Sequence, residues 1–449
     1  MDYPFRRLFS TLQIKQQKHK KLQHIILANG LKIRYNKHRT KECISMSYHD
    51  VKQYIEQSWE KALTELKTPT FSLPYAFVPP CVNGEFRVLY YWDTYFTNVG
   101  LIADGRADLA LNNVNTLLYA LNMFGCVPNC VKENGAEYAS QPPLLGLMIQ
   151  DVYRATKDEE WLSKAVQGLE REYDFWMRER ITKIGLNQYG GNCNNEASLC
   201  GYYDYVATRL PLPTDIPFAE KVQRGRNLLA EGESGEDFTP RYENHNALNY
   251  VQIDLNAHLY GVEEFLCDYY QDKNEQKSQQ YRANLEKRLQ LLNKYCYDVE
   301  KGIYFDYNFV TQKQSGVICA ACFTPWFYGF GGGRYGLKAV FDRLSCKSGI
   351  YACENFCDAS YQWGYPNLWA PHQYFAYEAL RKNGLIAEAN ALLNGYMKLL
   401  SDVFEKTGCL WERYHEDGVA PSLEYTTQEM LGWTAGVYNH FYRIKGESK

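Results

Sequence analysis

The chain has 449 residues, of which 45% are hydrophobic, and its formal net charge at pH 7 is −3. A chain of this length and composition can bury a large core, and its nearly balanced charge argues against a nucleic-acid partner. It contains no run of about 18 apolar residues, so the sequence predicts no membrane-spanning helix.

The first 50 residues differ in charge from the rest of the chain. They contain 11 Lys and Arg against 3 Asp and Glu, a net charge of +8, which leaves −11 for the remainder. This segment lacks the apolar core of a signal peptide, since its longest apolar stretch is Ile25 to Ala28. A transit peptide is an alternative, although Ser is sparse and Lys outnumbers Arg. We expect a poorly ordered basic leader at residues 1–50 and one acidic domain at residues 51–449.

Apolar residues recur at helical spacing from about residue 50 onward. Asp158 stands just before one such pattern and is expected to cap that helix. The expected helices span residues 51–67, 92–103, 107–123, 144–156, 158–179, 218–230, 251–271, 274–296, 337–344, 371–383, 385–404 and 427–444. Short hairpins are expected at residues 302–309 and 409–417.

No linker rich in Pro, Gly or Ser divides the chain, and few strands are expected. We therefore predict an all-α fold, an (α/α)6 toroid of six inner and six outer helices whose loops at one end line a deep pocket. The segment GFGGGRYG (329–336) has the glycines of a phosphate loop. It follows no convincing strand and lacks the Gly-Lys-Ser/Thr ending, so we expect it to lead flexibly into the next helix.

Fourteen cysteines are spread through the chain, and many stand in apolar segments, such as Cys267 in EEFLCDYY. Cysteine in such a place is a small buried hydrophobe. The CAAC segment, Cys319 to Cys322, has the spacing of a redox pair or of half a zinc site, but no second pair accompanies it. We expect core packing there, a reducing and therefore cytoplasmic compartment, and no metal or other cofactor.

The segment GESGEDFTPRYE (232–243) crowds carboxylates into a stretch that is neither a helix nor a strand. Glycoside hydrolysis requires two carboxyl groups on opposite sides of one bond, and Asp237 is the first candidate. Gly235 and Pro240 give a stiff, close turn around it, and Arg241 offers a charge to position it. The alternative is that these acids cap helices or face water.

The second candidate is Glu412, which stands between Trp411 and Arg413 in LWERYHEDG. Glu424 and Trp433 follow it in LEYTTQEMLGWTAGV and offer a polar and a stacking group. Tyr, Phe and Trp together make up 15% of the chain. Aromatic side chains near acids are one way to present flat apolar faces and hydroxyls to a sugar.

Six segments occur in an order that resembles the motif series of trehalases and of the related α-glucosidase families of the same clan. They are YYWDTYF (90–96), SQPPLLGLM (140–148), ESGEDFTPR (233–241), YQWGYPNLWAP (361–371), ERYHEDG (412–418) and EYTTQEMLGWTAGV (424–437). The resemblance covers roughly residues 55–445. It implies a helical toroid that inverts the anomeric centre, with Asp237 as general acid and Glu412 as general base.

The resemblance also implies a substrate-binding set. Trp92 and Asp93 would hold the sugar at the cleavage site. The further predicted contacts are Phe86, Tyr91, Asn129, Gln141, Gly235, Arg241, Trp363, Glu424 and Trp433. Because Glu233, Glu236 and Asp237 stand close together, we expect repulsion and burial to raise a carboxyl pKa, as a general acid requires.

The chain departs from trehalases where that family binds the second glucose. Glu85 and Ala139 replace arginines, Gly364 replaces an aspartate, and TRLPLP (208–213) only faintly resembles an arginine-bearing segment. Lost hydrogen-bonding groups at a polar site can cost orders of magnitude in discrimination. We predict a hydrolase for an α-linked hexoside other than trehalose, a small oligosaccharide or glycosyl conjugate.

Three alternatives stay open: a trehalase proper, a phosphorylase on the same toroid, or a glycan-binding protein without activity. The expected partner is a small carbohydrate, with no nucleic acid and no membrane. Neither the second sugar, nor the choice of glucose or mannose, nor the oligomeric state can be predicted from the sequence.

Overall fold

Helices dominate the structure, a computed structural model that describes residues 48–67, 72–84, 86–132, 135–136, 139–355, 361–421, 427–429 and 432–447. Almost all of the predicted leader, together with Glu85 and Glu424, lies outside these ranges. Residues 46–449 form one compact unit, and its described part contains fourteen α-helices.

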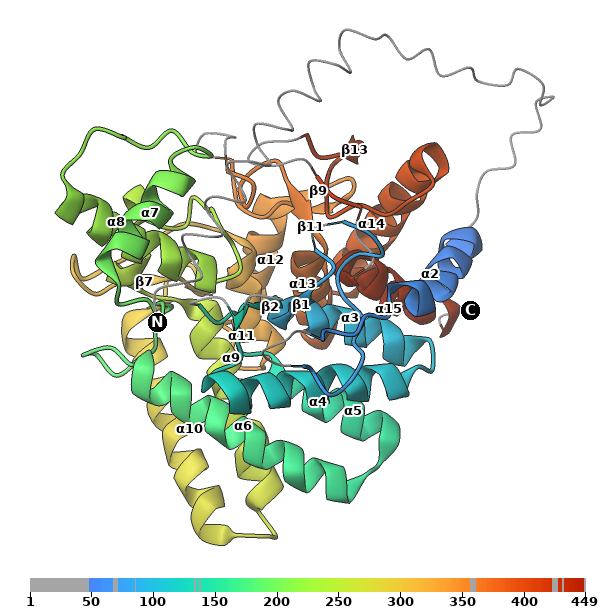
Figure 1. The fold of residues 1–449 in the computed structure, drawn as a ribbon, viewed down its shortest axis with the longest axis horizontal. Coiled ribbons are helices and arrows are strands. Elements are labelled where there is room, and N and C mark those ends of the chain that lie inside the picture. The colour runs from blue at the N-terminus through green and yellow to red at the C-terminus, as the bar shows by residue number, and fades with distance from the viewer. Residues whose placement is uncertain are drawn as a thin grey trace, which may run out of the picture. The chain divides into compact units, whose positions relative to one another are not determined.

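Six of the described helices form a closed inner ring (Figure 1). They are α3 (Tyr91–Ala103), α5 (Leu145–Thr156), α9 (Ile253–Tyr270), α11 (Thr324–Phe327), α13 (Ala370–Lys382) and α15 (Gly432–Glu447). Each contacts the next in this order, and α15 contacts α3, so the ring closes.

Outer helices pair with the inner ones. They are α2 (Tyr48–Ala62), α4 (Ala107–Phe124), α6 (Glu159–Glu179), α10 (Glu275–Tyr295), α12 (Arg334–Leu344) and α14 (Ile386–Thr407). The contacts join α3 to α4, α5 to α6, α9 to α10, α13 to α14 and α15 to α2, while α12 contacts the 3-10 turn η3 (Ala320–Phe323) before α11. This arrangement is the predicted all-α toroid.

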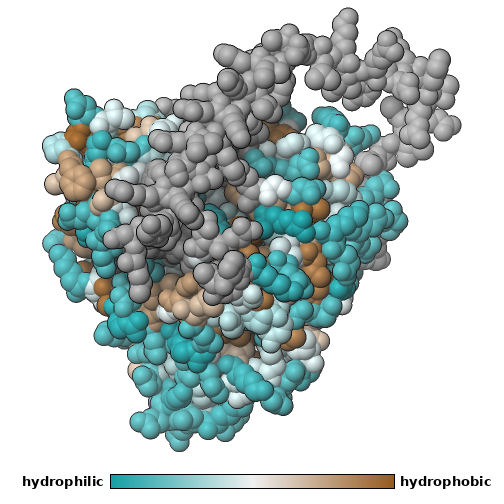
Figure 2. Space-filling model, in the orientation of Figure 1, coloured by the Kyte–Doolittle hydropathy of each residue, from teal (hydrophilic) through white to brown (hydrophobic). Residues whose placement is uncertain are grey.

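Burial separates the two layers. In α3 and in α13, 11 of the 13 residues are buried, as expected for helices surrounded by protein on all sides. The outer α6 buries one face only, for example Leu162, Val166 and Leu169. The face of the molecule in Figure 2 is accordingly mostly hydrophilic, with apolar side chains scattered over it.

The inner helices α3 and α15 approach each other closely at two glycines. A Cβ atom on Gly100 would lie 2.5 Å from the Cα of Gly436, and a Cβ on Gly436 would lie 1.9 Å from the carbonyl oxygen of Phe96. Glycine is therefore required at both positions.

Most predicted helices are present with small changes at their ends, and Asp158 caps α6 by accepting from the backbone N–H of Trp161 at 2.9 Å. The helix predicted at 51–67 ends at Ala62, because Thr64 and Lys67 form bridges to Phe77 and Ser72. The sequence did not predict α7 (Glu196–Val206), which packs on α8 (Phe218–Glu233) as an insertion between α6 and α9 (Figure 1).

Short antiparallel sheets decorate one end of the inner ring. Their strands are β1 (Leu89–Tyr90), β2 (Cys130–Lys132), β3 (Gly135–Ala136), β4 (Tyr250–Val251), β7 (Tyr307–Asn308), β8 (Lys313–Gln314), β11 (Leu368–Trp369), β12 (Arg413–His415) and β13 (Gly418–Val419). β1, β4 and β11 stand at or just before the first residues of α3, α9 and α13, so these sheets mark the N-terminal ends of those inner helices.

Two further pairs are β5 (Tyr297–Asp298) with β6 (Ile303–Tyr304), and β9 (Ser345–Cys346) with β10 (Gly349–Ile350). The hairpin predicted at 409–417 appears as β12–β13, and the segment 302–309 divides between two sheets as β6 and β7. Both cysteines of the CAAC segment are buried in the core, as predicted. Among the helices that the structure describes, none is both long and apolar enough to cross a bilayer.

Candidate active site

Three tryptophans meet where inner helices begin. Trp92 stands in the first turn of α3, Trp433 in the first turn of α15, and Trp363 in the loop before β11. The ring centroids of Trp92 lie 5.7 Å from Trp363 and 6.0 Å from Trp433. Trp369 stacks on Trp363 at 3.7 Å. These predicted binding residues therefore form one aromatic wall.

Residues 232–241 begin in the last turn of α8 and carry the predicted acid Asp237, for which we call them the catalytic loop; they pass directly over Trp92. A Cβ atom on Gly235 would lie 2.8 Å from Cε2 of Trp92, and the φ angle of Gly235 is +76°. Only glycine accommodates both constraints without strain. Gly235 thus lets the loop that carries Asp237 approach the ring of Trp92.

The pKa of Asp93 depends on its burial and on two other carboxyl groups. Its side chain is only 5% exposed. Burial is the largest cause that raises the pKa of Asp93 to about 8, and the negative charges of Glu412 and Asp237 raise it further. The two carboxylates predicted from distant segments therefore act on the same buried group.

Glu412 lies deep in the protein, with 2% of its surface exposed. Its backbone N–H donates to the carbonyl of Gln428 at 3.0 Å, and its carbonyl accepts from Nε1 of Trp433 at 3.0 Å. Nη1 of Arg413 lies 3.4 Å from its Oε2. The two backbone hydrogen bonds fix the position of Glu412, and its carboxylate lies beside the buried Arg413 guanidinium.

Asp237 is more accessible, with a side chain that is 38% exposed. Nη2 of Arg209 lies 3.8 Å from its Oδ2, and the Arg209 guanidinium also lies 5.4 Å from the ring centroid of Phe238. The peptide bond between Asp237 and Phe238 is cis. The sequence analysis did not single out Arg209, whose only signal is the faint resemblance of TRLPLP to an arginine-bearing segment.

The other two acids of the loop are neutralised by arginines, contrary to the predicted repulsion. Glu233 is fully buried and accepts from Arg180 at 2.7 and 2.8 Å, and from the backbone of Ser140 and Gly190 at 2.9 and 2.6 Å. Burial opposes ionisation of Glu236, but the charge of Arg241 and a hydrogen bond from His372 hold its pKa below the usual value. The prediction of repulsion within this cluster is wrong for Glu236.

Arg241 is also held in a cluster of ion pairs. Its side chain is fully buried and pairs with Glu236 at 3.0 Å, Asp254 at 2.7 Å and Asp306 at 3.1 Å. The arginine therefore ties the catalytic loop to α9 and to the segment between β6 and β7. The predicted roles of Arg241, to position Asp237 and to bind substrate, stay predictions.

Tyr91 is also buried, and its hydrogen bonds support neighbouring helices instead of facing a ligand. It is fully buried, its hydroxyl donates to Glu172, and it accepts from the backbone N–H of Leu145 at 3.0 Å. Gln141 accepts from the backbone N–H of Trp92 at 3.0 Å and so fixes the start of α3. Phe86 packs edge-on against Tyr90 at 5.8 Å.

Two predicted contact residues have a buried polar atom without a partner in the described part of the chain. Oδ1 of Asn129 and Nε1 of Trp363 are buried, and neither has a hydrogen-bond partner among the described residues. Unpaired buried polar atoms are uncommon and call for an explanation. An acceptor and a donor of this kind match the hydroxyl groups of a sugar. Glu424 lies outside the described residues.

A second layer braces the catalytic loop from behind. Nδ1 of His245 lies 2.8 Å from Oε2 of Glu231, whose Oε1 accepts from the backbone N–H of Thr239 at 2.8 Å. The His245 ring packs edge-on against Phe238 at 6.0 Å. These contacts therefore hold Phe238 and Thr239, the two residues that follow Asp237.

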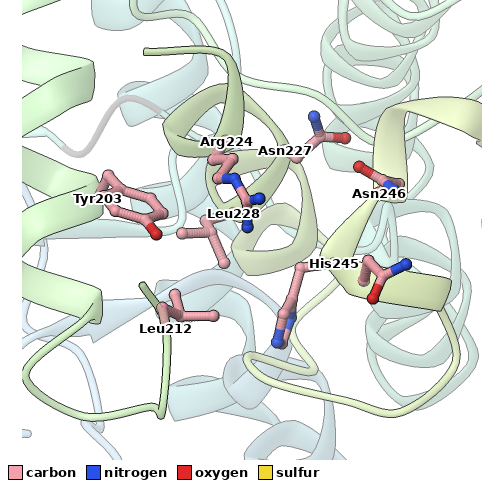
Figure 3. Close-up of a pocket in the computed structure, with 8 residues that line it drawn as sticks. Tyr203, Leu212, Arg224, Asn227, Leu228, His245 and Asn246 are labelled. Atoms are coloured by element: carbon pink, nitrogen blue, oxygen red, sulfur yellow. The ribbon is translucent and has the colours of Figure 1, made fainter. Parts of the chain in front are cut away.

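A small cavity lies beside His245 (Figure 3). It is lined by Tyr203, Leu212, Arg224, Asn227, Leu228, Asn244, His245 and Asn246. Its volume of about 10 Å³ is close to that of a single water molecule, so it does not take a sugar. Among the described residues, no three His, Cys, Asp or Glu side chains are arranged to hold a metal ion.

Comparison with known proteins relates this arrangement to one family. Residues 7–446 match the trehalase family, and this match begins inside the stretch predicted as a leader. Neutral trehalase Nth1 from Saccharomyces cerevisiae is 22% identical, with a TM-score of 0.69 over 89% of this chain and 80% of that chain. A GH63 mannosylglycerate hydrolase from Thermus thermophilus, in complex with glucose, is 15% identical, with a TM-score of 0.59 over 87% of this chain and 99% of that one. A rhamnosidase from Klebsiella oxytoca with rhamnose bound is 12% identical, with a TM-score of 0.55 over 82% and 60% of the two chains.

Proposed function

Because this chain belongs to the trehalase family and is a glycoside hydrolase, we propose that it cleaves an α-linked hexoside with inversion, using Asp237 and Glu412. The observation that carries this proposal is the close approach of the segment bearing Asp237 to Trp92, where a Cβ atom on Gly235 would lie 2.8 Å from Cε2 of that ring. A pocket that gathers these acids beside Trp92 and Trp363 suits the hydrolysis of a sugar.

In this proposal Asp237 is the general acid and protonates the glycosidic oxygen as the bond breaks. Glu412 is the general base and removes a proton from a water that attacks the opposite face of the anomeric carbon. Inverting enzymes keep the two carboxyl groups about 6.5–9.5 Å apart, which leaves room for that water. Nη1 of Arg413, 3.4 Å from Oε2 of Glu412, would help to hold this carboxylate in place.

The sugar at the cleavage site would rest on Trp92 and Trp363. Since burial raises the pKa of Asp93 to about 8, this carboxyl group keeps its proton at neutral pH and donates a hydrogen bond to a hydroxyl. Asn129 and the indole N–H of Trp363 supply an acceptor and a donor. In this proposal the indole rings contact one face of the hexose, and the polar groups bind hydroxyls at its edge.

The second position is where the proposal departs from trehalose. A Cβ atom on Gly364 would lie 3.3 Å from Cβ of Tyr361 and 3.5 Å from Cδ of Pro240, so an aspartate fits there only if its neighbours move. Ala139 is buried and apolar, and Arg209 is the cation beside Asp237. We propose an α-glucoside or α-mannoside with a small second group, and α,α-trehalase activity as the alternative. The cytoplasmic location inferred from the cysteines stays a prediction.

A substrate panel followed by proton NMR tests the proposal. The panel contains trehalose, other α-linked disaccharides, and glucosyl and mannosyl glycerates, each measured in the first minutes of reaction. Inversion by one displacement releases the β-anomer first, whereas an initial α-anomer would overturn the mechanism. Trehalose as the clear best substrate would overturn the specificity, and turnover only with added phosphate would favour a phosphorylase.

A further inference from the structure

Gln362 connects the two segments that carry Asp237 and Glu412. It stands in the loop before β11 and is 1% exposed. Its Nε2 donates to the backbone carbonyl of Asp237, and its Oε1 accepts from Nη1 of Arg413 at 2.8 Å. Its own carbonyl accepts from Nε1 of Trp369 at 2.9 Å. The buried side-chain amide of Gln362 therefore contacts the backbone of Asp237 and the side chain of Arg413, the residue next to Glu412.

Arg413 carries this connection on to Glu412. It is fully buried, its backbone pairs with Trp369 across β11 and β12, and its Nη1 lies 2.8 Å from Gln362 and 3.4 Å from Oε2 of Glu412. The contacts thus run from the carbonyl of Asp237 through the Gln362 amide and the Arg413 guanidinium to the Glu412 carboxylate. The backbone N–H of Trp363 donates to the carbonyl of Phe238 at 3.3 Å and reinforces the same junction.

The chemistry of the partners requires a carboxamide at this position. A backbone carbonyl only accepts and a guanidinium only donates, so the orientation of the amide is fixed by its neighbours. Glutamate has no N–H for the carbonyl of Asp237 and would compete with Glu412 for Arg413. Methionine has a similar length but forms neither hydrogen bond.

We propose that Gln362 is a positioning residue that sets the spacing between Asp237 and Glu412 and holds Arg413 beside the base. This inference rests on the proposed function, since it assigns a purpose to those two carboxylates. A residue that acts in this way changes turnover more than substrate binding, because misplacement of reacting groups by about 1 Å can cost roughly a hundredfold in rate.

Gln362→Glu is the direct test, in the full-length enzyme on its best substrate. We expect kcat to fall by at least about tenfold while KM changes by less than about threefold. The acidic limb of the pH profile should move up by about one pH unit, because the new charge draws Arg413 from Glu412 and adds a negative charge near the Glu412 carboxylate. A folded variant with the wild-type kcat and the wild-type acidic limb would overturn the inference.

Gln373→Glu is the matched control. Gln373 is also fully buried and bridges backbone groups of Ile350 and Trp369, but it contacts neither Asp237 nor Arg413. We expect this variant to lower Tm with an unchanged acidic limb. An equal shift of that limb in both variants would show a general effect of a buried charge and overturn the assignment to Gln362.

If Gln362→Glu does not fold, Gln362→Met takes its place. A loss of kcat at constant KM supports the inference, and wild-type kcat overturns it. Asp237→Asn and Glu412→Gln, measured in parallel, separate the two hypotheses. If both are inactive while the Gln362 variants behave as wild type, only the positioning role fails; if either stays active, the proposed function fails.

Discussion

Asp93→Asn tests the electrostatics of the pocket through protein stability. Burial, with the charges of Glu412 and Asp237, raises the pKa of Asp93 from 3.8 to about 8. Between these values the unfolded chain has lost the proton and the folded protein keeps it. Folding then carries a free-energy cost that is absent below about pH 3.8 and complete above about pH 8. An asparagine has the shape of the neutral acid and no such cost.

The magnitude follows from the size of this interval. Each pH unit within it costs about 1.4 kcal/mol, so the cost at pH 7 is about 4 kcal/mol. The stability gained by Asp93→Asn should therefore grow by about 3 kcal/mol from about pH 5 to about pH 7. Because the comparison is a difference between two pH values, changes in packing that do not depend on pH cancel.

Urea unfolding of the wild type and the variant at both pH values measures this difference. Asp272→Asn is the control for the simple loss of a negative charge, since Asp272 is exposed in the turn after α9. If the stability difference between Asp93→Asn and wild type is the same at both pH values, Asp93 is not a buried neutral acid. The argument that the three carboxyl groups share one pocket would then lose its basis.

Three further predictions concern the catalytic loop and its partners. Asp237→Asn and Glu412→Gln should each abolish turnover with a nearly unchanged Tm, measured by NMR of the products and by thermal melting; wild-type turnover in either would remove that residue from the mechanism. Gly235→Ala should destabilise the protein by about 1–3 kcal/mol and raise KM, because the new Cβ meets Trp92 at 2.8 Å in a left-handed backbone conformation; unchanged unfolding and KM would contradict the close approach. His245→Ala should lower the free energy of unfolding in urea by about 1–3 kcal/mol, because Oε2 of the buried Glu231 loses its partner. A variant as stable as wild type would show that this contact is not needed.

Much of the fold could be predicted because its helices are long and periodic. The patterns around residues 92–103 and 107–123 gave α3 and α4 almost to the residue. α11 has only four residues, too few for a helical period to appear. α7 was missed although its buried Leu199, Tyr203 and Val206 stand at helical spacing. Cys200, Tyr202 and Tyr205 add apolar side chains on other faces of this short helix, which obscures the pattern.

Candidate site residues were easier to name than their partners. Trp92, Trp363 and Trp433 come together from distant segments, and the pairing of Asp237 with Glu412 stays a prediction. The ion pairs of Arg241 with Asp254 and Asp306 could not be predicted, because these partners stand on other elements. Arg209 and Gln362 were not singled out, since their importance depends on contacts across the fold rather than on local pattern.

The pairing of charges also narrows the choice of acid within the loop. A buried carboxylate whose oxygens already accept hydrogen bonds from an arginine is not available to a substrate. Glu233 is bound to Arg180, and Glu236 to Arg241 and His372. Asp237 is the loop acid whose side chain is substantially exposed, and its ion pair with Arg209 is longer, at 3.8 Å. Glu233 and Glu236 therefore fasten the loop to the toroid, and we propose that Asp237 is the acid that meets the substrate.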